Sequence, residues 1–322
     1  MRAIRVQATG GPEVLELAEA DRPAPGPGEL LVEVAASGVN FIDTYQRSGV
    51  YSMPLPFTPG SEGAGTVAEA GPDVAGFTAG DRVAWAMTPG SYAEYAVVPA
   101  AKAVRIPEGL EDRTAAAAAL QGMTAHYLIA STHPVREGET ALVHAAAGGM
   151  GLLLTQLIKA RGGRVIGTVS TDEKERLARG AGADEIIRYT EADVAEGVRE
   201  LTGGRGVDVV YDGVGKDTFD ASLASLRPRG TLALFGAASG PVPPVDPQRL
   251  NSAGSVFLTR PSLASYLLDR DELDWRAGEV FGAIADGRLD IRIGGNYPLA
   301  DARKAHEDLE GRRTTGKLLL LP

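Results

Sequence analysis

Short runs of alternating apolar and polar residues fill roughly the first 110 residues, and clusters of glycine and proline separate these runs. Alternation with a period of two residues is typical of β-strands that are buried on one face, and glycine and proline favour the turns between them. We therefore predict a β-rich unit, partly barrel-like, in this part of the chain. Its predicted strands lie at residues 2–8, 14–20, 29–39, 63–71, 81–87, 92–98 and 103–107.

The pattern changes near residue 113, where an alanine-rich helical stretch begins that ends before Pro134. From residue 140 to residue 259, apolar runs alternate with amphipathic stretches of helical period. Strands that alternate with helices predict a parallel, doubly wound sheet with helices on both faces. The predicted strands lie at residues 140–145, 164–169, 185–189, 207–212, 231–236 and 255–259, and the first two helices at 149–162 and 171–182.

Residues 262–322 return to a mixed pattern, in which a β-like run follows a helical stretch. Such a tail can return to complete the first unit. The predicted fold class is therefore α/β, with a doubly wound parallel sheet beside a β-rich domain. The tail is predicted to hold a long helix at 263–286, a β-like run at 292–299, a helix at 300–310 and a strand at 317–321.

Composition and charge narrow the range of partners. The chain is 44% hydrophobic, and its net charge of −10 is poorly suited to binding nucleic acid or an anionic membrane, so we expect neither. The absence of cysteine excludes disulfides, thiol nucleophiles and cysteine–zinc sites. The chain has no apolar run of about 18 residues that could span a membrane. Residues 1–17 have no apolar signal core, so we expect a cytoplasmic protein.

The stretch "HAAAGGMGLL" follows a predicted strand and opens a predicted helix, which is the setting of a dinucleotide-binding loop. The usual pattern is G-x-G-x-x-G, and here the three positions hold Ala146, Gly148 and Gly151. Gly148 would let the backbone approach a pyrophosphate, and Gly151 would let helix and strand pack closely. The amides of Gly149, Met150 and Gly151 would face the pyrophosphate at the helix N-terminus. The alternative is a tight strand–helix turn without a ligand.

The end of the second strand of this domain indicates which dinucleotide binds. NAD enzymes usually carry an acidic residue there, whereas this chain has Ser170 and Thr171. These hydroxyls and the nearby Lys174 suit the 2′-phosphate of NADPH, so we predict NADPH as the cofactor. Asp172 and Glu173 are ordinary charges for the start of a helix. The alternative for Lys174 is a solvated helix residue.

Two further stretches, "AASGVNFIDTYQRSGVY" at 35–51 and "TPGSEGAGTV" at 58–67, make the chain resemble the medium-chain dehydrogenase/reductase superfamily. In its zinc alcohol dehydrogenases these stretches supply a cysteine and a histidine ligand, and here those positions hold Asn40 and Ser61. We therefore predict no metal. Over essentially its full length the chain is similar to the zinc-less NADPH:quinone oxidoreductases of the zeta-crystallin type, also through "VYDGVGKDTF", "LFGAASG" and "YPLADARKAHEDLEGRRTTGKLLL".

The resemblance implies a Rossmann domain inserted in a GroES-like domain, with NADPH and its acceptor in the cleft between them. The implied boundaries are 1–124 for the first part of the GroES-like domain, 125–261 for the Rossmann domain and 262–322 for the C-terminal return. It also implies a homodimer in which the strand 255–259 pairs with its copy, since an exposed edge strand is a liability.

The resemblance also assigns residues to the site. It implies that Asn40 and Tyr45 approach the nicotinamide end of the cofactor and that Tyr51 lines the acceptor pocket. For the mechanism we propose the Asn40 amide, the Tyr45 or Tyr51 hydroxyl, or water as hydrogen-bond donors to a developing oxyanion. The implied cofactor contacts are Asn40, Phe41, Asp43, Thr124, Tyr127, Gly148, Gly149, Met150, Gly151, Ser170, Thr171, Lys174, Tyr189, Gly213, Phe235, Gly236, Ala238, Leu258, Thr259 and Arg312. Simpler roles stay open for some of these. Tyr45 and Tyr51 could be core aromatics, Asn40 or Asp43 could cap a turn or helix, Tyr189 could be a strand-end residue, and Arg312 could face solvent.

The predicted function is NADPH-dependent quinone reduction by direct, metal-free hydride transfer. One alternative is reduction of the double bond of an α,β-unsaturated aldehyde or ketone. Another is a non-catalytic NADPH-binding protein with a structural or RNA-binding role, which the acidic composition disfavours. The physiological acceptor, and the choice between one- and two-electron reduction, stay open at this point.

Overall fold

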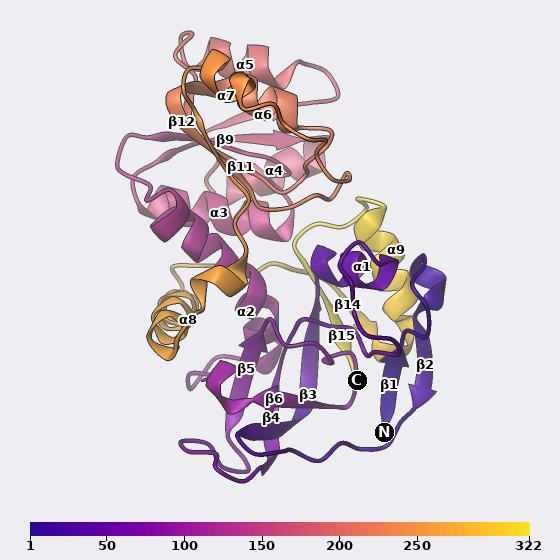
Figure 1. Cartoon of the computed structure of the whole chain (residues 1–322). Coiled ribbons are helices and arrows are strands. Elements are labelled where there is room, and N and C mark those ends of the chain that lie inside the picture. The colour runs from indigo at the N-terminus through magenta and orange to yellow at the C-terminus, as the bar shows by residue number, and fades with distance from the viewer. The chain divides into compact units, whose positions relative to one another are not determined.

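Residues 1–123 and 266–322 form one unit of the chain, and residues 124–265 form another. The computed structural model describes all residues from 1 to 322 (Figure 1). The chain therefore leaves the first unit once and returns to it with its last segment. None of its helices is both long enough and apolar enough to cross a membrane.

The first unit, residues 1–123 and 266–322, is built on a sheet of seven strands with the order β14-β15-β3-β4-β5-β7, and β6 also pairs with β3. The strands β1 and β2 form a separate antiparallel pair. The strands of this unit are β1 (Arg2–Arg5), β2 (Glu16–Glu19), β3 (Glu29–Val39), β4 (Glu62–Ala70), β5 (Arg82–Ala86), β6 (Tyr95–Pro99), β7 (Ala103–Arg105), β14 (Ile293–Pro298) and β15 (Lys317–Leu321).

The helices of the first unit lie in connections and in the C-terminal segment. Helix α1 packs against α9, and Figure 1 shows the two side by side. The α-helices are α1 (Phe41–Ser48), α2 (Asp112–Tyr127, which leads into the other unit), α8 (Arg270–Ala285) and α9 (Ala302–Glu310). The short turns are η1 (Pro12–Val14), η2 (Ala100–Lys102) and η5 (Leu299–Asp301).

The last strand of the chain is central to this unit. β15 pairs antiparallel with β3, with Leu319 opposite Gly38, and parallel with β14. Leu318, Leu319 and Leu320 are fully buried, and Leu318 and Leu320 pack with Val6 and Tyr92 in one apolar core. The alternation seen in the sequence is thus interrupted here by a wholly apolar strand, because β15 is covered on both faces.

Residues 124–265 contain a six-stranded parallel sheet with the order β10-β9-β8-β11-β12-β13. In chain order this is 3-2-1-4-5-6, the arrangement of a dinucleotide-binding domain, whose direction reverses between β8 and β11. The strands are β8 (Thr140–Val143), β9 (Arg164–Val169), β10 (Glu185–Arg188), β11 (Val207–Asp212), β12 (Leu226–Leu234) and β13 (Phe257–Thr259).

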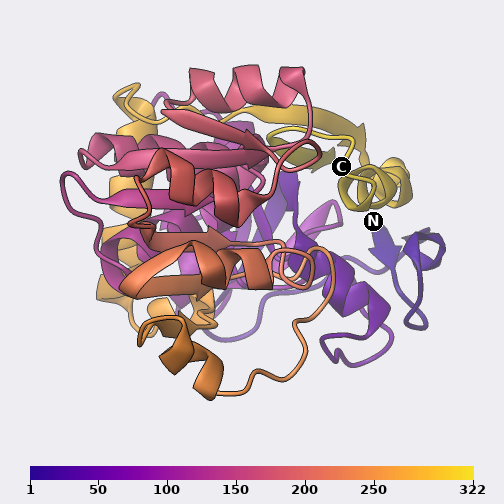
Figure 2. The same cartoon turned by 90° about the horizontal axis from the view of Figure 1, so that it is seen from above.

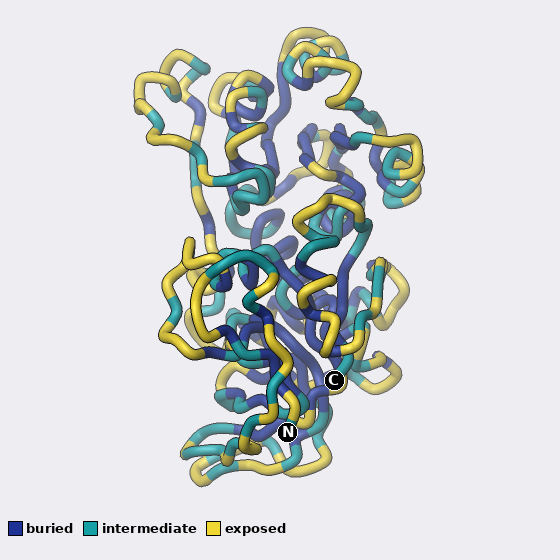
Figure 3. Tube along the Cα trace, turned by 90° about the vertical axis from the view of Figure 1, so that its right-hand side faces the viewer, coloured by how far each residue is buried: buried dark blue, intermediate teal, exposed yellow.

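Helices cover both faces of this sheet. Helix α3 packs on α4, α5 packs on α6, and Figure 2 shows helices above and below the strands. All six residues of β11 are buried. Figure 3 shows buried segments of the chain in dark blue and exposed segments in yellow. The helices are α3 (Gly149–Ala160), α4 (Asp172–Gly180), α5 (Val194–Leu201), α6 (Phe219–Ser225) and α7 (Gln248–Ser252), with the π-helix η3 (Leu128–Thr132) and the short 3-10 helix η4 (Leu263–Tyr266).

The predicted α/β fold class is confirmed, with a Rossmann-type sheet and a GroES-like β-rich part. The single long helix predicted at 263–286 is wrong, because the chain forms the turn η4 and then begins α8 at Arg270. Asp269 is the N-cap of α8, and its carboxylate accepts a hydrogen bond from the backbone N–H of Glu272. A capping aspartate inside an apolar helical pattern thus marked a helix start that periodicity alone did not reveal.

Candidate functional site

The glycine-rich loop lies between the end of β8 and the start of α3, next to the reversal point of the parallel sheet. Ala145 adopts a left-handed conformation with φ 50°. Its backbone N–H donates to the Thr168 hydroxyl at 3.2 Å, and the N–H of Ala146 donates to the Thr168 carbonyl at 3.0 Å. The loop is therefore attached to β9 by its own backbone, at the edge where dinucleotides bind in such sheets.

Ala146 occupies the position where the usual motif has its first glycine. Its side chain is fully buried, and a Cβ added to Gly167 on β9 would lie 2.7 Å from the Ala146 methyl group. The space that a first glycine would leave is therefore provided by a glycine on the neighbouring strand. The sequence motif did not indicate Gly167, because the two residues meet only when β8 and β9 pair.

The other two motif glycines differ in how tightly they are packed. A Cβ on Gly151 would lie 2.4 Å from the Ala145 carbonyl oxygen and 2.6 Å from the Ala146 Cα. A Cβ on Gly148 would meet only the Ala145 oxygen, at 3.2 Å. Gly151 thus permits the close approach of helix and loop. Gly148 is the N-cap of α3, where Gly149, Met150 and Gly151 form a first turn whose amides have no carbonyl one turn earlier in the helix.

A buried series of hydrogen-bonded side chains holds the strand ends next to this loop. Asp212, at the end of β11, accepts hydrogen bonds from the Ser222 hydroxyl at 2.7 Å and the Val214 N–H at 2.8 Å. His144, directly before the loop, bonds to Ser222 through Nε2 at 2.9 Å and to Thr168 through Nδ1 at 3.2 Å. Burial lowers the pKa of His144, so the ring is neutral. These hydrogen bonds connect β8, β9, β11 and α6 at the edge of the sheet that carries the loop.

The residues predicted to surround the adenosine end lie after β9 and β10. The Thr171 hydroxyl caps α4 by accepting from the Lys174 N–H at 3.3 Å, and Ser170 precedes it. Asp172 forms an ion pair with Arg188, a residue that no sequence motif indicated. Arg188 also pairs with Glu175 at 2.8 Å, so it offsets part of the acidic charge at the start of α4. Tyr189 follows β10 and is exposed.

The predicted residues after β11 and β12 lie in two interlocked turns. A Cβ on Gly236 would lie 2.4 Å from the Gly213 carbonyl oxygen, and one on Gly213 would lie 2.8 Å from the Phe235 ring. The Ala238 N–H donates to the Gly213 carbonyl at 3.2 Å. These glycines therefore allow the two strand ends to meet. Leu258 and Thr259 lie in β13, paired with β12.

In the other unit, three predicted aromatic residues cluster on α1 and the segment after it. The Tyr45 and Tyr51 rings lie 5.3 Å apart, edge to face, and the Phe41 and Tyr45 rings 6.3 Å apart. The Tyr51 N–H donates to the Tyr45 carbonyl at 3.0 Å. The Tyr51 side chain is 41% exposed, so this cluster presents an accessible hydroxyl-bearing surface.

Asp43 supports α1 from inside and is fully buried. Its carboxylate accepts hydrogen bonds from the Asn40 N–H at 2.9 Å, the Ser61 hydroxyl at 2.6 Å and the Tyr92 hydroxyl at 3.1 Å. Burial raises the pKa of Asp43 to about 6, against the effect of these hydrogen bonds. Asp43 thus has no exposed oxygen to offer a ligand, and it holds the start of α1 in place.

The hydrogen bonds continue from Tyr92 toward the surface. Tyr92 bonds to His306 Nε2 at 3.1 Å, and His306 Nδ1 lies 3.1 Å from Arg47, which pairs with Glu310 at 2.9 Å. Burial lowers the pKa of His306 to about 3. A guanidinium can only donate, so Nδ1 accepts from Arg47 and Nε2 carries the hydrogen, donated to Tyr92. Every donor in this series therefore points toward Asp43.

Asn40 and Ser61, the two positions compared above with zinc ligands, are both engaged in hydrogen bonds within the protein. Ser61 donates to Asp43, and the Asn40 amide bonds to Glu62 at 2.7 Å and Lys317 at 2.6 Å. No group of three or more His, Cys, Asp or Glu residues could hold a metal ion.

Three predicted residues lie elsewhere on the chain. Thr124 and Tyr127 are on α2 and are buried, Tyr127 almost completely. Arg312 lies in the exposed turn after α9, with φ 56°. Their predicted contacts with the cofactor remain predictions.

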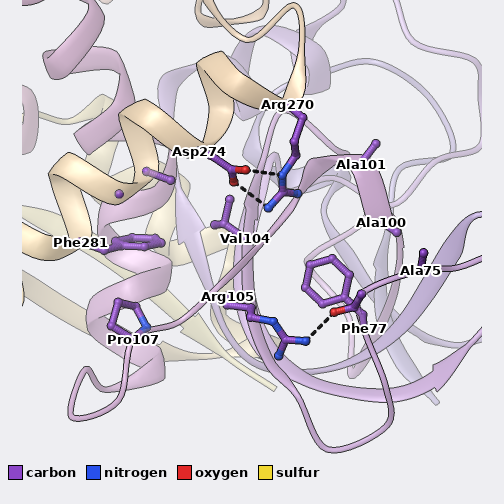
Figure 4. A pocket seen from close by; sticks show the side chains of 13 residues that line it. Ala75, Phe77, Ala100, Ala101, Val104, Arg105, Pro107, Arg270, Asp274 and Phe281 are labelled. Carbon is purple, nitrogen blue, oxygen red and sulfur yellow. Dashed lines mark hydrogen bonds and ion pairs between the residues drawn. The ribbon is translucent and has the colours of Figure 1, made fainter.

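A groove of about 680 Å³ lies between α8 and the turns near β7, and it contains none of the predicted site residues (Figure 4). Phe77, Val104 and Phe281 form apolar parts of its lining. Arg270 pairs with Asp274 at 2.6 Å, and Arg105 stacks 5.1 Å from the Phe77 ring. Both guanidinium groups are thus engaged within the protein, and the groove is separate from the candidate site.

Comparisons with known proteins place this geometry in context. The family described as alcohol dehydrogenase GroES-like domain matches residues 26–108, and the one described as zinc-binding dehydrogenase matches residues 149–275. A quinone oxidoreductase from Pseudomonas aeruginosa is 49% identical over 100% of this chain and 99% of its own length.

Two further relatives bear on the chemistry. The crystal structure of Escherichia coli quinone oxidoreductase complexed with NADPH is 44% identical, with a TM-score of 0.98 over 100% of both chains. A 2-haloacrylate reductase from a Burkholderia species is 43% identical over 98% of both chains. The likeness therefore covers the whole chain and spans more than one reductase activity.

Proposed function

The chain belongs to the quinone oxidoreductase family of the medium-chain dehydrogenase/reductase superfamily, and on that premise we propose that it reduces quinones with NADPH. The observation that carries the proposal is the loop at the reversal point of the parallel sheet. Gly151 and Gly167 give this loop the close packing that a dinucleotide-binding loop needs, although its first glycine is absent.

The residues present fit NADPH. A helix start without a side-chain cap suits a pyrophosphate, and the backbone amides of Gly149, Met150 and Gly151 are the donors that it offers. Because Asp172 is paired with Arg188, the strand end offers hydroxyls and Lys174 to a 2′-phosphate rather than an acid to a ribose hydroxyl. The other proposed cofactor contacts are Asn40, Phe41, Thr124, Tyr127, Ser170, Thr171, Tyr189, Gly213, Phe235, Gly236, Ala238, Leu258, Thr259 and Arg312, with Asp43 acting from beneath α1.

Bound NADPH supplies a hydride, which brings two electrons and one hydrogen to the quinone. The remaining hydrogen of the hydroquinone arrives as a proton from water, so no side chain has to be an obligate acid. The protein orients the acceptor and offers hydrogen bonds to the oxygen that gains negative charge. We propose the amide of Asn40 and the hydroxyls of Tyr45 and Tyr51 for this role.

A paired assay tests the function. The purified protein is given NADPH with a benzoquinone in one arm and a small enone in the other, and we expect faster NADPH oxidation with the quinone. The haloacrylate reductase among the relatives supports the enone as the second candidate, since its substrate also carries an activated double bond. Faster turnover of the enone would replace the first proposal with the second, and no turnover in either arm would contradict both.

Replacing Lys174 with Ala should weaken NADPH binding by about tenfold or more, because a phosphate loses about 1.4 kcal/mol or more of ionic interaction. NADH binding should change little, since NADH lacks the 2′-phosphate. Titration of both dinucleotides by nicotinamide fluorescence measures this. Lys159→Ala is the matched control, because it removes a lysine charge from α3 in the same unit of the chain. An equal loss for NADH and NADPH in Lys174→Ala would contradict the proposed role.

We also propose a homodimer that forms through β13. This strand pairs only with β12 in the sheet, and Phe257 at its start is 63% exposed. An open apolar edge favours pairing with another strand, and a second copy supplies one. Light scattering of the eluted protein should therefore report twice the chain mass, and a monomer at micromolar concentration would contradict the proposal.

A further inference from the structure

Asn40 is held by a buried ion pair that comes from two distant strands. The Lys317 ammonium on β15 donates to Asn40 Oδ1 at 2.6 Å, and Asn40 Nδ2 donates to Glu62 Oε1 on β4 at 2.7 Å. Lys317 and Glu62 also pair directly with each other. The Lys317 side chain is 2% exposed and the Glu62 side chain 0%. The three polar groups thus form a closed, buried triangle.

The charges of the two partners fix which way the Asn40 amide points. An ammonium can only donate hydrogen bonds, and a carboxylate can only accept them. The amide oxygen must therefore face Lys317, and the amide nitrogen must face Glu62. The reversed amide would place its oxygen against the carboxylate and its nitrogen against the ammonium, so that both contacts would become repulsive.

The surroundings keep the Glu62 carboxylate in one place. Its Oε2 accepts a hydrogen bond from the Leu120 N–H at 2.6 Å. A Cβ on Gly38 would lie 2.1 Å from Glu62 Oε1, so this glycine on β3 leaves the room that the carboxylate occupies. The triangle is therefore a rigid reference for the amide, and neither partner can follow it if it turns.

We infer that Lys317 and Glu62 are positioning residues, which make Asn40 present an N–H rather than a carbonyl oxygen to the acceptor. The inference rests on the proposed quinone reductase function. Nδ2 has two hydrogens: one is used by Glu62, and the other makes only a long contact of 3.4 Å with the Gly38 carbonyl. An oxygen that gains negative charge would compete with this long hydrogen bond for the second hydrogen, whereas a reversed amide would repel that oxygen.

Stability alone does not account for this ion pair. Removing two charges from water costs several kcal/mol per ion, and replacement of a buried pair by neutral groups of similar volume is often neutral or stabilising. A neutral pair would fill the same space, but it would not hold the amide in the observed orientation. The charged pair fixes that orientation, which is a property of the site and not of the packing.

The test is the double variant Lys317→Met with Glu62→Gln, which leaves no unpaired buried charge. The glutamine oxygen keeps the hydrogen bond from the Leu120 N–H, so its NH2 group faces Asn40 and favours the reversed amide. We expect kcat with a benzoquinone to fall by about 30-fold, while the quinone KM and the NADPH Kd stay within about threefold. The single variant Lys317→Arg keeps the charge and should therefore retain most of the wild-type kcat. Arg276→Met removes a buried cation elsewhere in the same unit and should leave kcat unchanged.

A variant cycle separates positioning from a general loss of structure. In an Asn40→Ala background, the same double replacement should lower kcat by less than about twofold further. An undiminished kcat in the folded double variant, or an equally large further loss in the Asn40→Ala background, would overturn the inference. If the wild-type protein itself does not reduce the quinone, it is the proposed function that fails.

The structural half of the inference has a readout that does not depend on activity. Asn40, Asn251 and Asn296 are the asparagines of the chain, so labelling asparagine with ¹⁵N gives few side-chain amide signals. In the wild type, the Asn40 amide hydrogens should exchange with solvent at least about tenfold more slowly than in the Lys317→Met/Glu62→Gln variant. Equal exchange rates in the two proteins would show that the ion pair does not hold the amide.

Discussion

Gly151→Ala should raise the Kd for NADPH by about 100-fold or more and should destabilise residues 124–265 by about 1–3 kcal/mol. The added Cβ would lie 2.4 Å from the Ala145 carbonyl oxygen and within 2.7 Å of two backbone atoms of Ala146. Backbone atoms cannot turn away as a side-chain tip can. The loop and the start of α3 must therefore separate, and the amides at the helix start leave the positions that the pyrophosphate needs.

Fluorescence titration with NADPH and thermal unfolding measure the two effects of this change. Gly180→Ala is the control for a glycine in the same domain, because a Cβ there has no neighbour within 4 Å. Gly148→Ala separates the effects further: its Cβ would meet only the Ala145 oxygen at 3.2 Å, so stability should change little while NADPH binding weakens. Wild-type affinity in Gly151→Ala would show that the loop does not bind the dinucleotide.

The order of strands and helices in residues 124–265 could be predicted because each element carries its own signal. Strands such as β11 are apolar at nearly every position, and amphipathic helices follow them, so local periodicity implies a parallel sheet. The glycine loop could be predicted for the same reason, since all its motif residues lie within seven positions of the chain. Local pattern is therefore sufficient for the fold of this unit and for the place of its loop.

Contacts between segments that are distant in the sequence leave no local pattern of apolar and polar residues from which they could be predicted. In the sequence, Lys317 is an ordinary charged residue before a run of leucines. Only the pairing of β15 with β3 brings it to Asn40, 277 positions away. Gly167 meets Ala146 only across two paired strands. The sequence likewise does not indicate the partners of His144 and His306, which are Ser222 and Tyr92. A single sequence shows which residues are unusual and not which of them meet.

Replacing His306 with Gln should change how the stability of the first unit depends on pH. The ordinary pKa of histidine is 6.5, and burial lowers the pKa of His306 to about 3. The unfolded chain therefore binds a proton below about pH 6.5 that the folded protein does not. The stability that His306 provides is present above that pH and is lost as the pH falls. Between about pH 7 and pH 4 this loss amounts to about 3 kcal/mol.

Asp43 changes the stability in the opposite direction as the pH falls. Its ordinary pKa is 3.8 and burial raises it to about 6, so the folded protein binds a proton that the unfolded chain releases. Acidification from about pH 7 to pH 4 should therefore add about 2 kcal/mol of stability through Asp43. Asp43 and His306 are joined through Tyr92, and Arg47 and Glu310 complete the series. Because the two contributions to the free energy of unfolding have opposite signs and similar size, the pH dependence of the wild type shows neither of them clearly.

Single variants should uncover the two contributions with opposite slopes. Both tryptophans, Trp85 and Trp275, lie in the first unit, so urea unfolding followed by their fluorescence reports on the unit that contains Asp43 and His306. The stability difference between the wild type and His306→Gln should shrink as the pH falls, whereas the difference between the wild type and Asp43→Asn should grow. Hydrogen bonds that are lost in either variant lower the free energy of unfolding by the same amount at every pH. They therefore shift the plot of stability against pH without changing its slope. Parallel curves for the wild type and His306→Gln would mean that the pKa of His306 is the same in the folded and the unfolded protein, which would contradict a pKa lowered by burial.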